Sequence, residues 1–169
     1  MSLDARTALA AASVGIGATL FMDVWNLFLK RALGIASLNY CLLGRWVRHM
    51  PSGTLRHASI GAAERKPYEC AVGWVAHYSI GIVFALGFIL LVSGKWLVHP
   101  TPAPALLYGI ATVVFPFFLM QPSLGLGIAA SRTPNPAQAR LKSLATHTMF
   151  GIGLYVCGLA VSSMVRTRG

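Results

Sequence analysis

The sequence predicts an all-α polytopic membrane protein, with four transmembrane helices in a bundle and a short interfacial helix after the first span. Of its 169 residues, 56% are hydrophobic and only 11% are charged, whereas a soluble domain carries roughly a quarter charged residues. The hydrophobic residues gather in stretches near the roughly 20 residues that a bilayer-spanning helix needs. Basic residues cluster between these stretches, which is typical of membrane topology.

The predicted spans make one membrane domain over residues 1–169. We interpret the first as a retained helix rather than a signal peptide, because Asp4 offsets Arg6 and no A-x-A-like site follows the apolar run. Lys30 and Arg31 stop this span, and Gly34 begins a helix break. The predicted spans are about 7–29, 69–92, 105–130 and 139–165.

Two prolines interrupt the third span. Pro116 and Pro122 each lack a backbone donor, so we expect a kinked or partly unwound helix over 115–127. Non-helical backbone at membrane depth needs protein or a wet cavity to shield it. Asn135 followed by Pro136 predicts the N-cap and first helical position of the fourth span.

A short segment after the first span has the pattern of a helix lying in the membrane interface. Ser37 is its expected N-cap, and the segment runs over about 38–50. Its apolar residues recur at four-residue steps while its basic residues fall towards another side. The apolar positions are Leu38, Leu42, Trp46 and Met50, and the basic side holds Arg45, Arg48 and His49.

The three cysteines predict no cross-link. Cys41, Cys70 and Cys157 are scattered, odd in number and without CxxC spacing. Neither a disulfide framework nor a zinc site follows from such a pattern. We therefore expect buried free thiols.

The charge distribution predicts the orientation. The net charge is +10, but its placement between apolar spans favours anionic lipid head groups over nucleic acid as the partner. Ten bases belong to the loops after the first and third spans and the turns that follow, against four on the other side. Loops 30–68 and 131–138 are therefore predicted to be cytoplasmic and both termini periplasmic. The expected head-group contacts are Arg45, Arg48, Arg132, Arg140 and Lys142.

Each predicted span contains one strongly polar residue at depth. Five to ten residues separate each of them from the cytoplasmic end of its span, which corresponds to roughly 8–15 Å at 1.5 Å per residue. Each also shares a helix face with small residues, which line contact faces in membrane bundles. Gln121, for example, is expected to share a face with Gly125 and Ala129. The four residues of this predicted polar layer are Asp23, His77, Gln121 and His147.

Several functions fit such a layer. It could bind or relay a small ion, because Asp and His inside membranes mark proton and ion paths. Asp23, His77 and His147 could instead ligate a divalent transition metal, or the two histidines a haem, in a membrane redox or enzyme subunit. A membrane enzyme that acts on a lipid or another apolar substrate is a further hypothesis, in which basic residues would bind a phosphate of the substrate. A purely structural hydrogen-bond cluster remains open.

The sequence contains no G-x-S-x-G, Walker A, dinucleotide or Ser/His/Asp pattern. These absences favour a protein without catalytic activity. We predict an ion-binding or ion-relaying membrane protein, with the bilayer as its partner and a second copy of the chain as a candidate partner.

Five long blocks resemble a family of small bacterial inner-membrane proteins known as domain of unknown function 2938. The resemblance covers most of the chain, with the blocks in order. It implies an inner-membrane location and this architecture, and it implies no assigned activity, cofactor or partner. The blocks are Gly15–Trp25, Ser37–Trp46, Gly73–Ile82, Pro116–Pro134 and Thr146–Tyr155.

Overall fold

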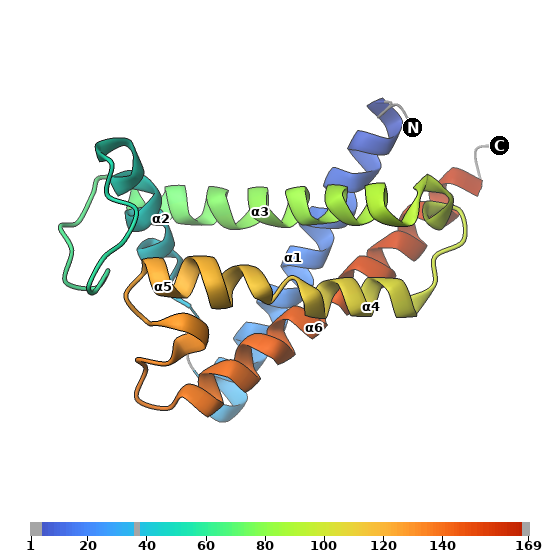
Figure 1. The fold of residues 1–169 in the computed structure, drawn as a ribbon. Coiled ribbons are helices and arrows are strands. Elements are labelled where there is room, and N and C mark those ends of the chain that lie inside the picture. Colours follow the sequence, from blue (N-terminus) through green and yellow to red (C-terminus); the bar gives the residue numbers. More distant parts are fainter. Residues whose placement is uncertain (1–4, 36–37, 167–169) are drawn as a thin grey trace. The chain divides into compact units, whose positions relative to one another are not determined.

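The computed structural model describes residues 5–35 and 38–166 and is all-α there (Figure 1). The described part has four helices long and apolar enough to cross a membrane. The fold class is therefore confirmed, including the short helix after the first span. The helices are α1 (Ala5–Leu33), α2 (Tyr40–His49), α3 (Glu69–Val92), α4 (Pro102–Ala111), α5 (Gln121–Ser123) and α6 (Pro136–Arg166).

The third span is broken, as predicted, but it ends at Ser123 rather than near residue 130. It runs over Pro102–Ser123, with α4 first, a π-helix over Pro116–Met120 and then α5. Pro116 opens the π-helix, where the ordinary hydrogen-bond pattern cannot continue through a residue without an N–H. Gly125 has a φ of +88°, which ends any helix there. The expected helical face of Gln121, Gly125 and Ala129 is therefore wrong.

The contacts within the chain divide it into two compact units. Unit 1 contains α1, α3 from Tyr78 onward, α4, and α6 from Thr146 onward. Unit 2 contains α2 and the loop after it, the first part of α3 up to His77, and residues 112–145. Segments distant in sequence therefore build each unit.

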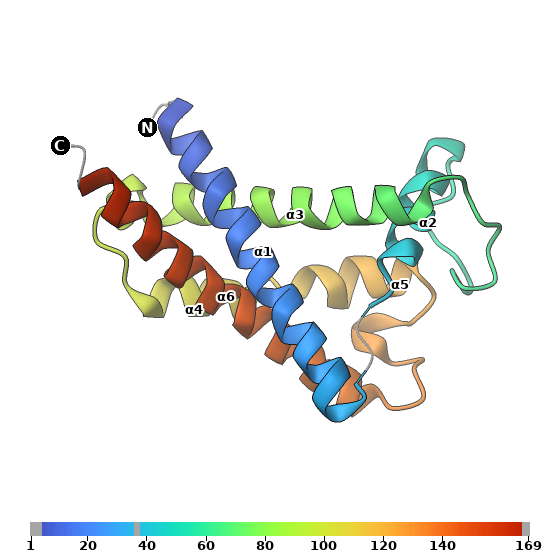
Figure 2. The same cartoon turned by 180° about the vertical axis from the view of Figure 1, so that it is seen from behind.

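Small residues bring the helices of unit 1 together. At three helix pairs, a Cβ added to a glycine would meet the neighbouring backbone at 2.8 Å or less. Such close approach is how membrane helices gain packing contacts when lipid offers no hydrophobic driving force. Larger residues such as Phe88, Phe150 and Leu154 fill the core. The approaches are Gly15 to Ile82 (α1–α3), Gly153 to Ala18 (α6–α1) and Gly151 to Ala105 (α6–α4; Figure 2).

In unit 2, α2 packs into a protein core. Its N-cap is Asn39, whose Oδ1 accepts from the Cys41 N–H at 3.0 Å; the expected cap, Ser37, lies outside the described residues. Leu43 and Trp46 are buried in a cluster with Ile60 and Leu124. The buried face of α2 therefore contacts a loop and the end of the third span.

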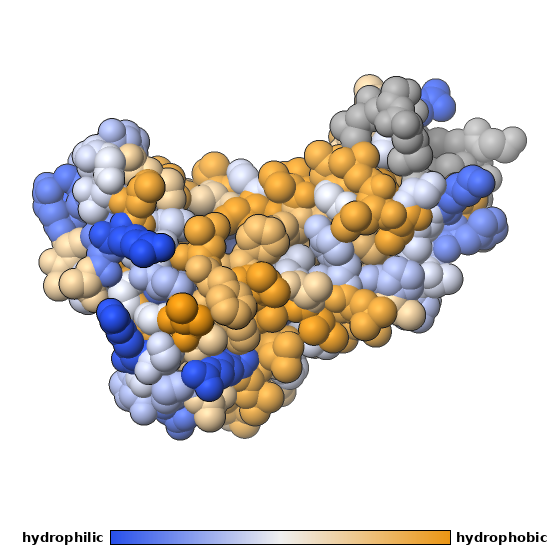
Figure 3. All heavy atoms as spheres, viewed as in Figure 1, coloured by the Kyte–Doolittle hydropathy of each residue, from blue (hydrophilic) through white to orange (hydrophobic). Residues whose placement is uncertain are grey.

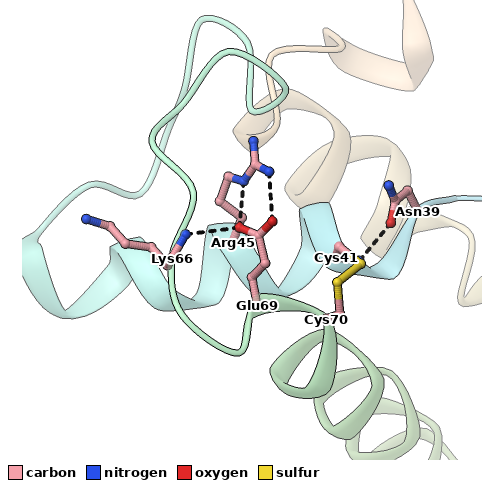
Figure 4. The surroundings of a disulfide bond; sticks show 6 residues. All are labelled: Asn39, Cys41, Arg45, Lys66, Glu69 and Cys70. Atoms are coloured by element: carbon pink, nitrogen blue, oxygen red, sulfur yellow. Dashed lines mark hydrogen bonds and ion pairs between the residues drawn. A yellow bond between two sulfur atoms is a disulfide. The ribbon is translucent and has the colours of Figure 1, made fainter.

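A disulfide joins Cys41 on α2 to Cys70 in the first turn of α3 (Figure 4). The expectation of free thiols is wrong for these two residues and is met by Cys157, which is free and half-buried. Two glycines make the pairing feasible. A Cβ on Gly73 would meet the Tyr40 carbonyl oxygen, and one on Gly44 would meet that of Glu69. Because 29 positions separate the cysteines, their spacing alone carried no sign of this approach.

We predict that Gly15→Ala destabilises the protein. Its new Cβ would lie 2.7 Å from the Ile82 Cα and 2.8 Å from the Gly81 carbonyl oxygen, and backbone atoms cannot rotate away. Overpacking typically lowers the free energy of unfolding by about 1–3 kcal/mol, which exceeds the gain of about 1 kcal/mol from alanine's better helix propensity. Thermal unfolding in detergent measures the change.

Gly61→Ala is the matched control. The nearest atom to its new Cβ is the Ser59 hydroxyl oxygen at 3.7 Å, so we expect a change within about 0.5 kcal/mol. A Gly15→Ala protein as stable as wild type would contradict the proposed packing.

Candidate functional site

The structure distributes the four predicted polar residues over both units. Asp23 on α1 and His147 on α6 belong to unit 1, whereas His77 on α3 and Gln121 on α5 belong to unit 2. Each is at least half-buried. Their assembly into one layer stays a prediction, and each unit offers its own polar contacts.

In unit 1, Asp23 has a partner that the predicted layer did not contain. Its carboxylate accepts a hydrogen bond from the Tyr78 hydroxyl of α3. Tyr78 follows His77 directly in sequence, so the two side chains leave the helix about 100° apart. The Asp23 carboxylate, the charged group that the sequence predicts within the spans, is thus hydrogen-bonded to a phenol. A phenol hydroxyl can also donate and accept a hydrogen bond.

A second polar contact of unit 1 lies three residues further along α1. Asn26 is only 8% exposed, and its Oδ1 accepts from the Thr146 hydroxyl of α6 at 3.2 Å. Thr146 immediately precedes His147. Because residues three apart are neighbours on a helix surface, Asp23 and Asn26 form a polar strip on α1.

His77 occupies an aromatic site in unit 2. It is 8% exposed, and its ring stacks on Tyr40 of α2 with 4.1 Å between centroids and 23° between planes. Trp74 meets the same ring edge-on at 6.0 Å. The approach of α2 to α3 at Gly44 and Gly73 places Tyr40 here. An imidazole flanked by two aromatic rings is held in one orientation.

Gln121 lies directly after the π-helix of the third span. It is 7% exposed, and its side-chain oxygen Oε1 is buried without a hydrogen-bond partner among the described residues. Its backbone N–H donates to the Pro116 carbonyl oxygen, the i→i−5 pattern of a π-turn. Such turns are frequent at functional sites. A buried acceptor without a partner is unfavourable by about 1–3 kcal/mol, so Gln121 is a position where a proton donor would be stabilised.

The described residues contain no group of three or more His, Cys, Asp or Glu side chains that could hold a metal ion. The metal set expected from sequence, Asp23 with His77 and His147, gains no structural support from this finding. The same finding gives no structural support to the hypothesis that His77 and His147 ligate a haem.

Among the five predicted head-group contacts, Arg45 is a correction. It is 5% exposed, and its Nε and Nη2 donate to the Glu69 carboxylate at 2.8 Å each (Figure 4). Its Nη1 donates to three loop carbonyls, those of Ile60, Gly61 and Ala63. The hydrogen bond to Glu69 raises the pKa of Arg45 above its usual value, against the opposing effect of burial. Arg45 is therefore a structural residue, buried among protein groups that satisfy its donors.

The other four predicted contacts differ among themselves. Arg48 and Arg132 are exposed. Arg140 is exposed as well, and its Nε donates to the Ala129 carbonyl at 2.8 Å, so it also supports a loop. Lys142 is half-buried within α6.

Sequence reasoning missed three polar partners: Tyr78, Asn26 and Thr146. The signal for Asn26 was present, because it shares a helix face with Thr19 and Asp23. Tyr78 and Thr146 each lie next to a predicted histidine, but adjacency in sequence does not place two side chains on one helix face.

We predict that Glu69→Gln strongly destabilises the protein. The side chains of Arg45 and Glu69 are 6% and 13% exposed, so the substitution leaves a buried guanidinium without its counter-charge. Breaking a buried pair in this way typically lowers the free energy of unfolding by about 3–5 kcal/mol. Denaturation in detergent measures the loss.

Glu64→Gln is the control, since it breaks the Lys66–Glu64 pair, whose Glu64 side chain is 74% exposed. Exposed ion pairs contribute little to stability because water screens them, so we expect little change. Equal losses in both variants would show that burial of the Arg45 pair is not what matters.

Residues 12–161 match the model of a family described as a protein of unknown function, DUF2938. No curated protein and no solved structure matches the chain.

Proposed function

The chain belongs to the DUF2938 family, whose description names no activity, and from its own residues we propose that it binds or relays protons within the membrane. The observation that carries the proposal is the hydrogen bond between Tyr78 and Asp23. Asp23 is the only carboxylate away from the ends of the described spans. A carboxylate at membrane depth is expensive and normally marks a proton or ion path.

Three further polar residues support a relay. His147 can accept and donate a proton through its two ring nitrogens, and it follows Thr146, which bonds to Asn26. His77 has the same capacity in unit 2, and Gln121 offers a buried acceptor. In this proposal Asp23, His77 and His147 exchange the proton, Gln121 accepts a hydrogen bond from the group that carries it, and Tyr78 positions the Asp23 carboxylate. A proton needs one acceptor at a time, whereas a metal needs several ligands together.

We predict that Asp23→Asn abolishes proton flux. In liposomes with an imposed pH gradient and an internal pH-sensitive dye, wild-type protein should dissipate the gradient. Asparagine keeps the size of the side chain but cannot take up a proton, so this variant should match protein-free liposomes. Tyr78→Phe should reduce the flux, because the carboxylate loses its hydrogen bond.

Glu64→Gln is the matched control, since it removes a carboxylate outside the spans. Its flux should equal that of wild type. Flux that is undiminished in Asp23→Asn protein would refute the relay.

For orientation, we infer a multi-pass protein of the bacterial inner membrane with loops 30–68 and 131–138 in the cytoplasm, facing anionic lipid head groups. The excess of basic residues in and beside these loops supports this orientation. The disulfide offers a test, because cytosolic thiols are kept reduced whereas periplasmic cysteines form disulfides. Cys41 and Cys70 both lie on the loop side of their spans.

Although the structure joins Cys41 to Cys70 by a disulfide, the cytoplasmic orientation predicts that both are thiols in intact cells and that their bond forms only after oxidation. Cells are treated with a permeant maleimide, then lysed, reduced and labelled with a heavy maleimide that shifts the protein on a gel. The cytoplasmic orientation predicts no heavy labelling at the two cysteines, because both are blocked at the first step. Cys157→Ser protein removes the background. Two heavy labels on this variant would place the loops in the periplasm.

A further inference from the structure

Unit 2 contains a cavity of about 590 Å³ that neither the predicted polar layer nor the proton relay uses. It lies between the loop after α2 and the end of the third span. Its chemistry is mixed, with basic and hydroxyl groups on part of the wall and apolar groups on the rest. We name it the arginine cavity, and its defining residues are Arg56, His57, Phe118, Pro122, Ser131 and Arg132.

The first wall is held by the end of the third span. The His57 N–H donates to the Ser123 carbonyl oxygen at 2.9 Å, and the Ile60 N–H donates to that of Leu124 at 3.1 Å. A Cβ at Gly125 would meet the Ala58 carbonyl oxygen, so only glycine permits this approach. These contacts fix the backbone that carries Arg56 and His57.

The second wall is a loop with unusual backbone angles. Two alanines adopt the left-handed region, Ala129 at a φ of 47° and Ala130 at 59°, which costs roughly 1–2 kcal/mol per residue. Strained backbone of this kind clusters at functional sites. Two hydrogen bonds hold the loop, from the Arg132 N–H to the Leu126 carbonyl at 2.9 Å and from Arg140 Nε to that of Ala129 at 2.8 Å. The loop thereby presents Ser131 and Arg132 to the cavity.

The charges of the cavity lack a counter-charge. The described carboxylates of unit 2 are Glu64 and Glu69, and they are engaged by Lys66 and Arg45 respectively. The guanidinium groups of Arg56 and Arg132 make no hydrogen bond or ion pair within the described residues. Arginine presents a planar fork of donors that matches phosphate oxygens. Two such groups on one cavity therefore favour a phosphate-bearing ligand.

His57 adds further binding capacity. Both of its ring nitrogens are shielded from water and lack a hydrogen-bond partner among the described residues. A buried donor without a partner is unfavourable. Rotation of this side chain towards a phosphate in the cavity would supply an acceptor for its N–H.

The apolar part of the wall indicates what the phosphate is attached to. Phe118 is 61% exposed and Ile128, which also lines the cavity, is 58% exposed. Figure 3 shows hydrophilic side chains beside apolar surface in the region of α2 and α5. Phe118 belongs to the candidate span itself, so the apolar wall continues into the part of the chain suited to hydrocarbon.

We propose that the arginine cavity binds the phosphate group of a phosphate-bearing amphiphile. Arg56 and Arg132 grip the phosphate oxygens, Ser131 donates a hydrogen bond, and Phe118 and Ile128 contact the apolar part. A membrane phospholipid and a soluble phosphate ester share this phosphate chemistry. The residues of the cavity include none of Asp23, Tyr78 and His147, so this proposal can be tested independently of the proton relay.

The test compares three probes on purified protein in detergent. Dioleoylphosphatidylglycerol has phosphate and acyl chains, diglucosyl diacylglycerol has chains without phosphate, and glycerol 3-phosphate has phosphate without chains. Native mass spectrometry and melting temperature report binding. We expect phosphatidylglycerol to bind wild type best and to raise its melting temperature most. Arg56→Gln and Arg132→Gln should each weaken this binding by about tenfold or more, the effect of losing a charge-assisted hydrogen bond.

Arg48→Gln is the matched control, because it removes the same charge from an exposed position of unit 2 that does not line the cavity. It should bind phosphatidylglycerol as wild type does. If glycerol 3-phosphate alone reproduces the effect, with the same loss in the arginine variants, the ligand is a soluble phosphate ester. Equal binding of the phosphate-free lipid, or an equal loss in Arg48→Gln protein, would overturn the proposal.

A folding defect can be separated from a binding defect. Arg132→Lys keeps the charge but loses the fork of donors, and it should fold and bind phosphatidylglycerol at intermediate strength. Wild-type binding in a well-folded Arg56→Gln, Arg132→Gln double variant would also overturn the proposal.

Discussion

Unit 2 depends on one buried guanidinium. Arg45 satisfies its donors with both oxygens of Glu69 and with three carbonyl groups of the loop at residues 60–63. One side chain thereby ties together α2, the loop after it and the first turn of α3. A buried charge is tolerable only when its partners are complete, so each of these segments constrains the others. The His77–Tyr40 stack and the first wall of the arginine cavity both rest on elements that Arg45 holds.

Unit 1 is held together differently, because no buried guanidinium joins its helices among the described residues. Their backbones approach through glycine and alanine. Asp23 is accommodated by the Tyr78 hydroxyl, and Asn26 by Thr146. Side-chain hydrogen bonds between membrane helices contribute only about 0.6 kcal/mol on average. Stability alone is therefore a weak reason to keep a carboxylate at this depth, which strengthens the functional reading.

The sequence was most informative where a property depends on local pattern. Apolar length located the spans, and the two prolines located the break in the third. The N-cap at Asn135 followed in the same way, since its Oδ1 accepts from the Gln138 N–H at 3.1 Å. Properties that depend on how distant segments meet were missed. The Cys41–Cys70 bond and the Arg45–Glu69 pair both form because Gly44 and Gly73 let α2 lie against α3, and no spacing rule encodes that approach.

The basic residues show why counting charges describes function poorly in this protein. The count of basic residues that predicts orientation includes three that have structural partners. Arg45 is paired with Glu69 and Lys66 with Glu64, and Arg140 donates a hydrogen bond that supports a loop. Removing these from consideration leaves Arg56 and Arg132 as bases of unit 2 that are both unpaired and gathered on one cavity. A positive loop charge that served orientation alone would need no defined geometry. The left-handed alanines beside Ser131 and Arg132 impose such a geometry at an energetic cost. A bound ligand that needs these two side chains in a fixed arrangement explains that cost.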